Sequence, residues 1–255
     1  MINFENIKVA FADKSDKDLS RAYLLFKTIS NPFISNTLTA FIKVAMWLHL
    51  PISWAIKATV YKHFCGGTTI ENSQATIDKL WESHIGTILD FSAEGKEIEE
   101  DFNLAMNETI ASIQKAKSES SIPFSVFKPT GLARFALLEK ISSKLKLTKE
   151  EEIEKNTFEG RIENICRIAS ENKVPLFIDA EESWIQNEID DIAIAMMQKF
   201  NKNEAWIFNT LQLYRNDRVD HLEMLLKLAT EKKFFVGLKL VRGAYHEQEI
   251  ERAKE

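Results

Sequence analysis

Residues Phe234 to Tyr245 read Phe-Phe-Val-Gly-Leu-Lys-Leu-Val-Arg-Gly-Ala-Tyr, and this stretch decides the fold. Its apolar run is typical of a strand that is covered on both faces of a parallel sheet. Its second half carries two cations, Lys239 and Arg242. Because an unpaired buried charge is very costly, we interpret the strand end as the wall of a polar pocket for an anionic or electron-rich ligand. An ion pair between Lys239 and a neighbouring carboxylate is a purely structural alternative.

Upstream of this stretch, apolar segments alternate with helical segments. We expect strands at residues 85–91, 123–127, 174–179, 205–214 and 234–244. This alternation predicts βα units and a parallel sheet, that is, an α/β fold. Residues 1–84 contain no convincing strand, so we place a helical N-terminal region at 1–84 and the α/β domain at 85–255.

The composition fits a soluble globular protein: 255 residues, 45% hydrophobic and 28% charged. The net charge of -5 argues against nucleic acid as a partner and against an anionic membrane as the main partner. The two cysteines fit no metal spacing and are expected to be reduced. The N-terminus does not read as a signal peptide. The most apolar region, residues 38–64, contains lysines and Pro51 and is too short and interrupted for a membrane-spanning helix, although association with a membrane surface stays open.

Polar residues end four successive predicted strands. These residues are Lys128, Asp179, Gln212 and Lys239, the last followed by Arg242. Because ligands of α/β sheets and barrels bind at the carboxyl ends of the strands, we expect a ligand site there. The glycines form neither a dinucleotide fingerprint nor a phosphate-binding loop, and the histidines form no HExxH motif.

Three kinds of site fit these strand ends. A metal site could use Asp179, Glu181 and His246. A Schiff-base aldolase could use Lys128 or Lys239 as its nucleophile. A redox cofactor could be held by the strand-end cations and an amide. Composition alone does not choose among them.

Four sequence blocks together resemble the proline dehydrogenase family. They are Phe-Lys128-Pro-Thr-Gly-Leu, Ile-Asp179-Ala180-Glu181-Glu182, Asn-Thr-Leu-Gln212-Leu-Tyr214 and Leu-Val-Arg242-Gly243-Ala244-Tyr245. The resemblance covers about residues 85–255 and extends more loosely into the N-terminal region. It implies a (β/α)8 barrel of the TIM type that binds FAD. It also implies oxidation of L-proline to 1-pyrroline-5-carboxylate, the first step of proline catabolism to glutamate, with electrons passed to a membrane quinone.

The resemblance also implies roles for the strand-end residues. Lys128 would pair with the proline carboxylate, and Tyr245 would pack near the substrate. Asp179 would lie by the reacting centre as a catalytic residue. Lys239, the second catalytic residue, would place a cation by the flavin, which gains electron density on reduction. The implied cofactor-binding residues are Ala180, Gln212, Arg242, Gly243 and Ala244, and no metal is implied.

Other polar residues near the strand ends are interpreted as structural. Glu181, Glu182 and Trp184 are expected to be helix-start and packing residues. Arg252 is expected to face solvent or to pair with Glu249 three residues before it on a helix.

Only five of the eight strands of a barrel can be counted in the sequence. We therefore expect an incomplete barrel from a fragment or truncated product that binds FAD poorly by itself and turns over little. A second hypothesis is a non-catalytic fragment that associates with another chain, or with its own copy, through open sheet edges. We expect a cytoplasmic location, peripheral to the inner membrane.

Overall fold

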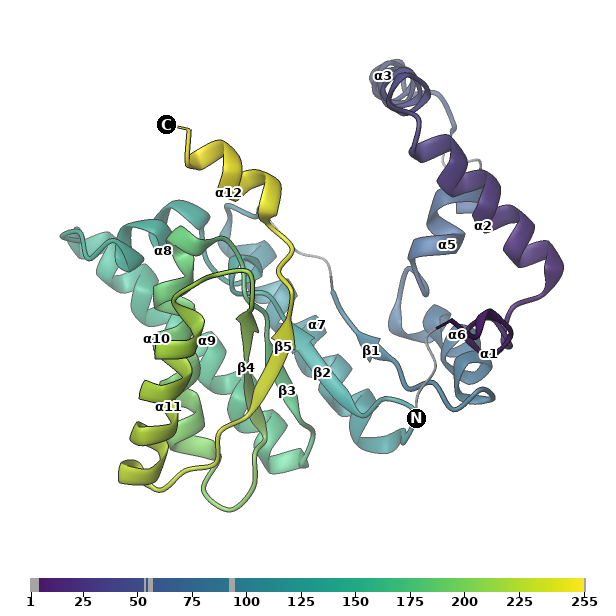
Figure 1. The fold of residues 1–255 in the computed structure, drawn as a ribbon. Coiled ribbons are helices and arrows are strands. Elements are labelled where there is room, and N and C mark those ends of the chain that lie inside the picture. The colour runs from purple at the N-terminus through teal and green to yellow at the C-terminus, as the bar shows by residue number, and fades with distance from the viewer. Residues whose placement is uncertain (1–4, 53, 55–56, 92–94, 255) are drawn as a thin grey trace. The chain divides into compact units, whose positions relative to one another are not determined.

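A computed structural model of the chain describes residues 5–52, 54, 57–91 and 95–254 (Figure 1). Residues 53, 55 and 56 of the apolar region therefore lie outside the described residues. The chain divides into two compact units, Met1–Ile85 and Gly86–Glu255.

The N-terminal unit is helical. Its helices are α1 (Ile7–Ala10), α2 (Asp16–Ile29), α3 (Pro32–Trp47), the π-helix η1 (Lys57–Tyr61), α5 (Lys62–Phe64) and α6 (Ile70–Trp81). Helix α2 begins where the Ser15 side chain accepts a hydrogen bond from the Asp18 N–H, and α3 begins at Pro32 behind the cap Asn31. None of the described helices is both long and apolar enough to cross a membrane.

The second unit contains a parallel five-stranded sheet. Its strands are β1 (Ile88–Leu89), β2 (Phe124–Phe127), β3 (Leu176–Ile178), β4 (Ile207–Gln212) and β5 (Leu238–Val241). The pairing places them in chain order, and each neighbouring pair is parallel. In Figure 1, β5 crosses in front of the other strands. The α/β fold with about five βα units is therefore confirmed, and consecutive parallel strands are the arrangement of a (β/α) barrel.

Helices follow the strands of this sheet along the chain. They are α7 (Glu99–Ser118), the 3-10 turn η2 (Pro129–Gly131), α8 (Phe135–Ser142), α9 (Lys149–Asn172), α10 (Ser183–Phe200), α11 (Arg218–Lys232) and α12 (His246–Arg252). Helix α7 packs on β2 and α10 packs on β4. The core contains the strand side chains Leu176, Ile178 and Ile207, which are fully buried. A capping box between Thr148 and Glu151 starts α9.

The strands are shorter than the sequence predicts. The predicted fifth strand starts at Phe234, but the Phe234 N–H bonds the Ala229 carbonyl and so closes the end of α11. The Phe235 N–H bonds the carbonyl of Asn201 instead of a strand neighbour. Four residues thus separate Lys233, which ends α11 in the left-handed conformation, from the first residue of β5.

Candidate functional site

The register of the sheet brings the predicted strand-end residues to one edge. Thr210 of β4 pairs with Lys239 of β5, and the residue before Thr210 pairs with Ile178 of β3. Asp179 follows Ile178, and its N–H donates to the carbonyl of Phe127 at 3.1 Å. Lys128, Asp179 and Lys239 therefore lie at one level across the sheet, and Gln212 ends β4 beside them.

The central contact of this edge is an ion pair between Lys239 and Asp179. The Lys239 Nζ lies 2.5 Å from Asp179 Oδ1, and the two side chains are 30% and 19% exposed. The same ammonium lies 5.2 Å from the centroid of the Phe177 ring, a cation–π distance. Phe177 itself stacks on Phe124 at 4.5 Å. The pair thus fixes one cation above an aromatic surface while leaving part of it accessible.

Glu181 occupies a buried position that differs from the expected helix-start role. Its side chain is 2% exposed, and its oxygens accept two hydrogen bonds from Thr130, from the N–H at 2.9 Å and from Oγ1 at 2.5 Å. Desolvation raises the pKa of the carboxyl to about 7, although the Thr130 hydrogen bonds oppose that rise. Glu181 therefore joins the turn after β2 to the segment after β3, which sequence reasoning missed.

Gln212 joins the ends of three strands. Its Nε2 donates to the Glu181 carbonyl at 2.7 Å, and its Oε1 accepts from the Ala244 N–H at 3.4 Å. The side chain is buried. Both ends of the amide are thus oriented by backbone, and the amide that the sequence predicts to contact a cofactor has one fixed orientation.

The residues after β5 differ in exposure. Arg242 and Ala244 are exposed, whereas Gly243 and Tyr245 are half-buried, and Ala180 after β3 is buried.

Gly243 has a local structural reason for being glycine. Its φ is +126°, and a Cβ added there would lie 1.5 Å from Cε1 of the Tyr214 ring. The Tyr214 ring therefore fills the space that a side chain at residue 243 would need, which accounts for this glycine without a cofactor. Burial, and then Glu249, raises the pKa of the Tyr214 hydroxyl.

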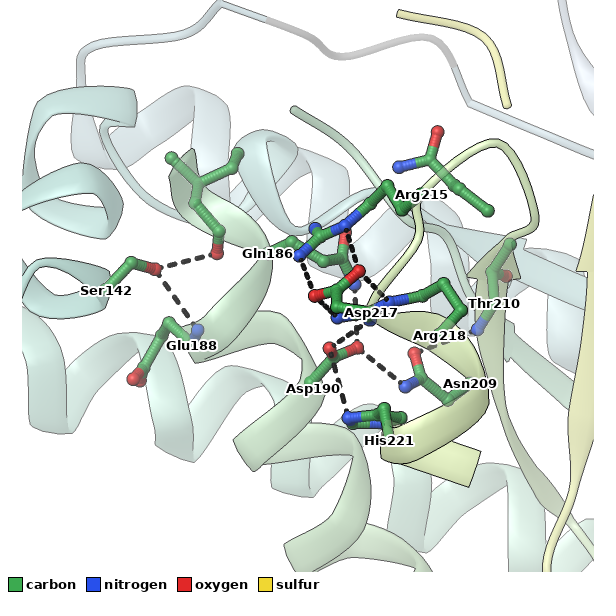
Figure 2. Close-up of polar contacts among 12 residues, drawn as sticks. Ser142, Gln186, Glu188, Asp190, Asn209, Thr210, Arg215, Asp217, Arg218 and His221 are labelled. Atoms are coloured by element: carbon green, nitrogen blue, oxygen red, sulfur yellow. Dashed lines mark hydrogen bonds and ion pairs between the residues drawn. The ribbon is translucent and has the colours of Figure 1, made fainter. Parts of the chain in front are cut away.

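A buried polar cluster around Asp190 joins α10, β4 and α11 (Figure 2). The carboxylate of Asp190 on α10 is reached by side chains from α10, β4 and α11: Gln186 Nε2 at 2.8 Å, Asn209 Nδ2 at 2.9 Å, Arg218 Nη1 at 2.7 Å and His221 Nδ1 at 3.8 Å. The Gln186 Oε1 in turn accepts from the Glu181 N–H at 2.9 Å. The cluster is therefore connected through one glutamine to the strand ends.

The charged side chains of helix α12 bind residues of other helices. Glu249 accepts hydrogen bonds from the N–H and Oγ of Ser183, both at 2.7 Å, at the start of α10. Arg252 pairs with Glu139 of α8 at 2.7 Å, and its guanidinium lies 4.6 Å from the centre of the Trp184 ring. Of the two alternatives expected for Arg252, exposure to solvent is confirmed, because its side chain is 48% exposed, whereas its ion-pair partner is Glu139 and not Glu249.

The metal site considered from the sequence, built on Asp179, Glu181 and His246, does not form among the described residues. Within the described ranges, no group of three or more histidine, cysteine, aspartate or glutamate side chains could hold a metal. Glu181, one of the residues considered for a metal, has both carboxylate oxygens bonded to Thr130. The strand ends instead present the partly exposed cation of Lys239 beside the buried, backbone-bonded amide of Gln212.

Comparisons with known proteins agree on one family. The family model for proline dehydrogenase matches residues 73–255. The carbapenem antibiotics biosynthesis protein CarD of Pectobacterium carotovorum subsp. carotovorum is 33% identical over 186 residues, covering 73% of this chain and 50% of that protein. Proline dehydrogenase 1 of Dictyostelium discoideum, a mitochondrial protein, is 28% identical and covers 96% of this chain and 50% of its own length. The chain thus spans about half the length of these curated relatives.

Solved structures resemble the fold. Proline utilization A from Bdellovibrio bacteriovorus, solved after inactivation by N-propargylglycine, superimposes with a TM-score of 0.66 at 15% identity, covering 98% of this chain and 27% of that one. Proline utilization A from Bradyrhizobium japonicum gives 0.58 over 74% of this chain and 19% of its own.

Proposed function

Because the chain belongs to the proline dehydrogenase family, we propose that it takes part in the FAD-dependent oxidation of L-proline to 1-pyrroline-5-carboxylate. In this proposal the reaction is the first step of proline catabolism to glutamate, and a quinone receives the electrons. The observation that carries the proposal is the Lys239–Asp179 ion pair, which lies at the carboxyl ends of the strands together with Lys128 and Gln212.

The side chains of this edge suit distinct tasks. FAD, when bound, supplies the acceptor for the hydride of the substrate. Lys239 and Gln212 would hold its electron-rich ring edge, with Arg242 and the backbone of residues 243–244 beside it. Lys128 supplies a point charge for the carboxylate of proline. Asp179 holds the Lys239 ammonium in one orientation through Oδ1, so the cation needs no reorganisation as negative charge develops.

Single-turnover flavin reduction tests the proposal. The full chain, in excess over FAD, is kept without oxygen, L-proline is added, and loss of the oxidised-flavin absorption is followed. Because the chain is expected to bind FAD poorly by itself, we expect slow reduction with the unmodified chain and none with Lys239→Met. Reduction that is equally fast in Lys239→Met would refute the assigned site, and borohydride trapping of a carbonyl substrate on a lysine would favour the aldolase.

We further propose a peripheral contact with the membrane that carries the quinone, for a protein located in the cytoplasm. Large apolar side chains of the N-terminal unit are highly exposed, among them Phe33 at 80% and Trp47 at 75%. Exposed aromatic and aliphatic side chains favour the interface of a bilayer. Co-sedimentation with vesicles of mixed neutral and anionic lipid is expected for the full chain and weaker binding for Phe33→Ser. Equal binding by both would contradict this contact.

Self-association through the sheet is a second candidate, favoured by β5. This strand has a neighbour on one side among the described residues, and its Leu240 side chain is 61% exposed. Exposed apolar edges promote pairing between chains. Sedimentation velocity is expected to show a dimer or larger species that Leu240→Lys converts to monomer, and a concentration-independent monomer would contradict it.

A further inference from the structure

The hydrogen bonds described above join the ends of β2, β3 and β4 through Glu181. Its carboxylate takes both donors of Thr130, in the turn that directly follows Lys128. Its carbonyl holds Gln212, whose Oε1 reaches the segment after β5. Its N–H is held by Gln186, which the buried Asp190 orients. A shift of Glu181 would therefore displace the turn after Lys128 and the Gln212 amide together, that is, the predicted substrate-binding and cofactor-binding groups.

A purely structural link does not need a carboxylate here. Burying an acid is costly, and a glutamine has a carbonyl and an amide of similar shape. The acid adds a charge that faces two other charged groups, Lys128, which favours ionisation, and Glu182, which opposes it. With its pKa raised to about 7, the group changes charge near neutral pH.

We propose that Glu181 is a positioning residue that couples the Lys128 turn to the Gln212 amide and sets the affinity of the site for the carboxylate of an amino acid. The catalytic meaning of this coupling rests on the function proposed above. When Glu181 is ionised, both Thr130 donors are satisfied by charge-assisted bonds and the turn is held. When it is protonated, one carboxyl oxygen carries a proton and one of those two bonds is lost or reversed.

Glu181→Gln removes the charge and keeps the shape, and Glu188→Gln is its matched control. Glu188 lies on α10, is also buried, and burial likewise raises its pKa to about 7. The charged groups that act on it are Lys155, Glu159 and Asp191, none of which belongs to the strand-end site. Any general effect of neutralising a buried glutamate should therefore appear in both variants.

The first measurement needs no flavin. The backbone amide resonance of Thr130 and the side-chain amide resonance of Gln212 are followed by NMR from pH 5 to pH 9 in the full chain. We expect both resonances to titrate with one midpoint near 7 in the unmodified protein and in Glu188→Gln, and neither to titrate in Glu181→Gln. A Gln212 resonance that stays constant while Thr130 titrates would overturn the coupling. If Glu181→Gln fails to fold, the titrations of the unmodified chain and of Glu188→Gln decide.

The second measurement relates the coupling to substrate. In steady-state oxidation of L-proline with FAD and an artificial electron acceptor that reoxidises it, Glu181→Gln is expected to raise KM about tenfold with a smaller change in kcat, and to flatten the dependence of KM on pH between 6 and 8. Glu188→Gln should keep the KM and the kcat of the unmodified chain. Equal KM values in the two variants would overturn the role in affinity. Absence of reduction in every protein, with the NMR coupling intact, would remove the proposed function and leave Glu181 as the link between the two groups.

Discussion

The stability of the second unit should fall as the pH rises through neutrality, because of the buried Glu181. Desolvation holds its pKa at about 7 in the folded chain, above its ordinary value of 4.5. Between these two values the folded form keeps a proton that the unfolded form has lost. Stability decreases with pH wherever the folded state binds more protons, so this contribution is fully present below pH 4.5 and is lost as the pH passes 7.

The size of the effect follows from the two pKa values. Each pKa unit corresponds to about 1.4 kcal/mol, so the interval from 4.5 to about 7 gives a loss of about 3 kcal/mol. Solvent screening reduces this little, since the side chain is 2% exposed. Glu188 contributes in the same direction, but its contribution is common to the unmodified chain and Glu181→Gln and cancels in their difference.

Urea unfolding measures this difference. Replacing Trp47, Trp54 and Trp81 by phenylalanine leaves Trp184 and Trp206 to report on the second unit. The unfolding free energy of this background minus that of its Glu181→Gln variant should fall by about 3 kcal/mol from pH 4.5 to pH 8. A difference that is constant over this range, or that rises with pH, would refute the assignment of a raised pKa to Glu181.

Three further predictions concern other parts of the second unit. Lys239→Met should abolish flavin reduction by proline. It should cost only about 1 kcal/mol of stability, since the ion pair is partly exposed, and a loss of folding would contradict this. Gly243→Ala should lower the thermal midpoint through a strain of more than about 1 kcal/mol, because a Cβ would overlap the Tyr214 ring, and an unchanged midpoint would argue against that packing. The thiol of Cys166, whose pKa burial raises, should resist a disulfide reagent that labels the exposed Cys65, and should react only in urea.

The order of strands and the site edge could be predicted from local patterns. Apolar runs that end in polar residues place Lys128, Asp179, Gln212 and Lys239 at strand ends, and a parallel sheet brings such ends to one edge. The structure adds their pairing, since Lys239 contacts Asp179 across 60 residues of sequence. The ion pair that was the structural alternative for Lys239 is therefore present, and the ligand site at the same strand ends stays a prediction.

The role of Glu181 could not be predicted for a physical reason. An acid directly before a helix is common because it complements the helix dipole, so its local sequence favours an exposed helix-start role. Its actual partner, Thr130, lies 51 residues away and comes into contact only when β2 and β3 pair. The shortness of β1 has a similar origin, because the Thr87 N–H bonds the Ser121 carbonyl of a loop and regular pairing starts one residue later.

The central claim, that the strand ends of this chain form the flavin and proline site, is tested most directly by NMR titration of the labelled full chain with FAD and then L-proline. This measurement registers weak binding as well as strong binding. We expect the resonances of Lys128, Asp179, Gln212 and Lys239 to shift together, while those of residues 172–175 at the opposite end of the sheet stay in place. Shifts confined to residues 172–175, or no shifts at millimolar FAD, would contradict it.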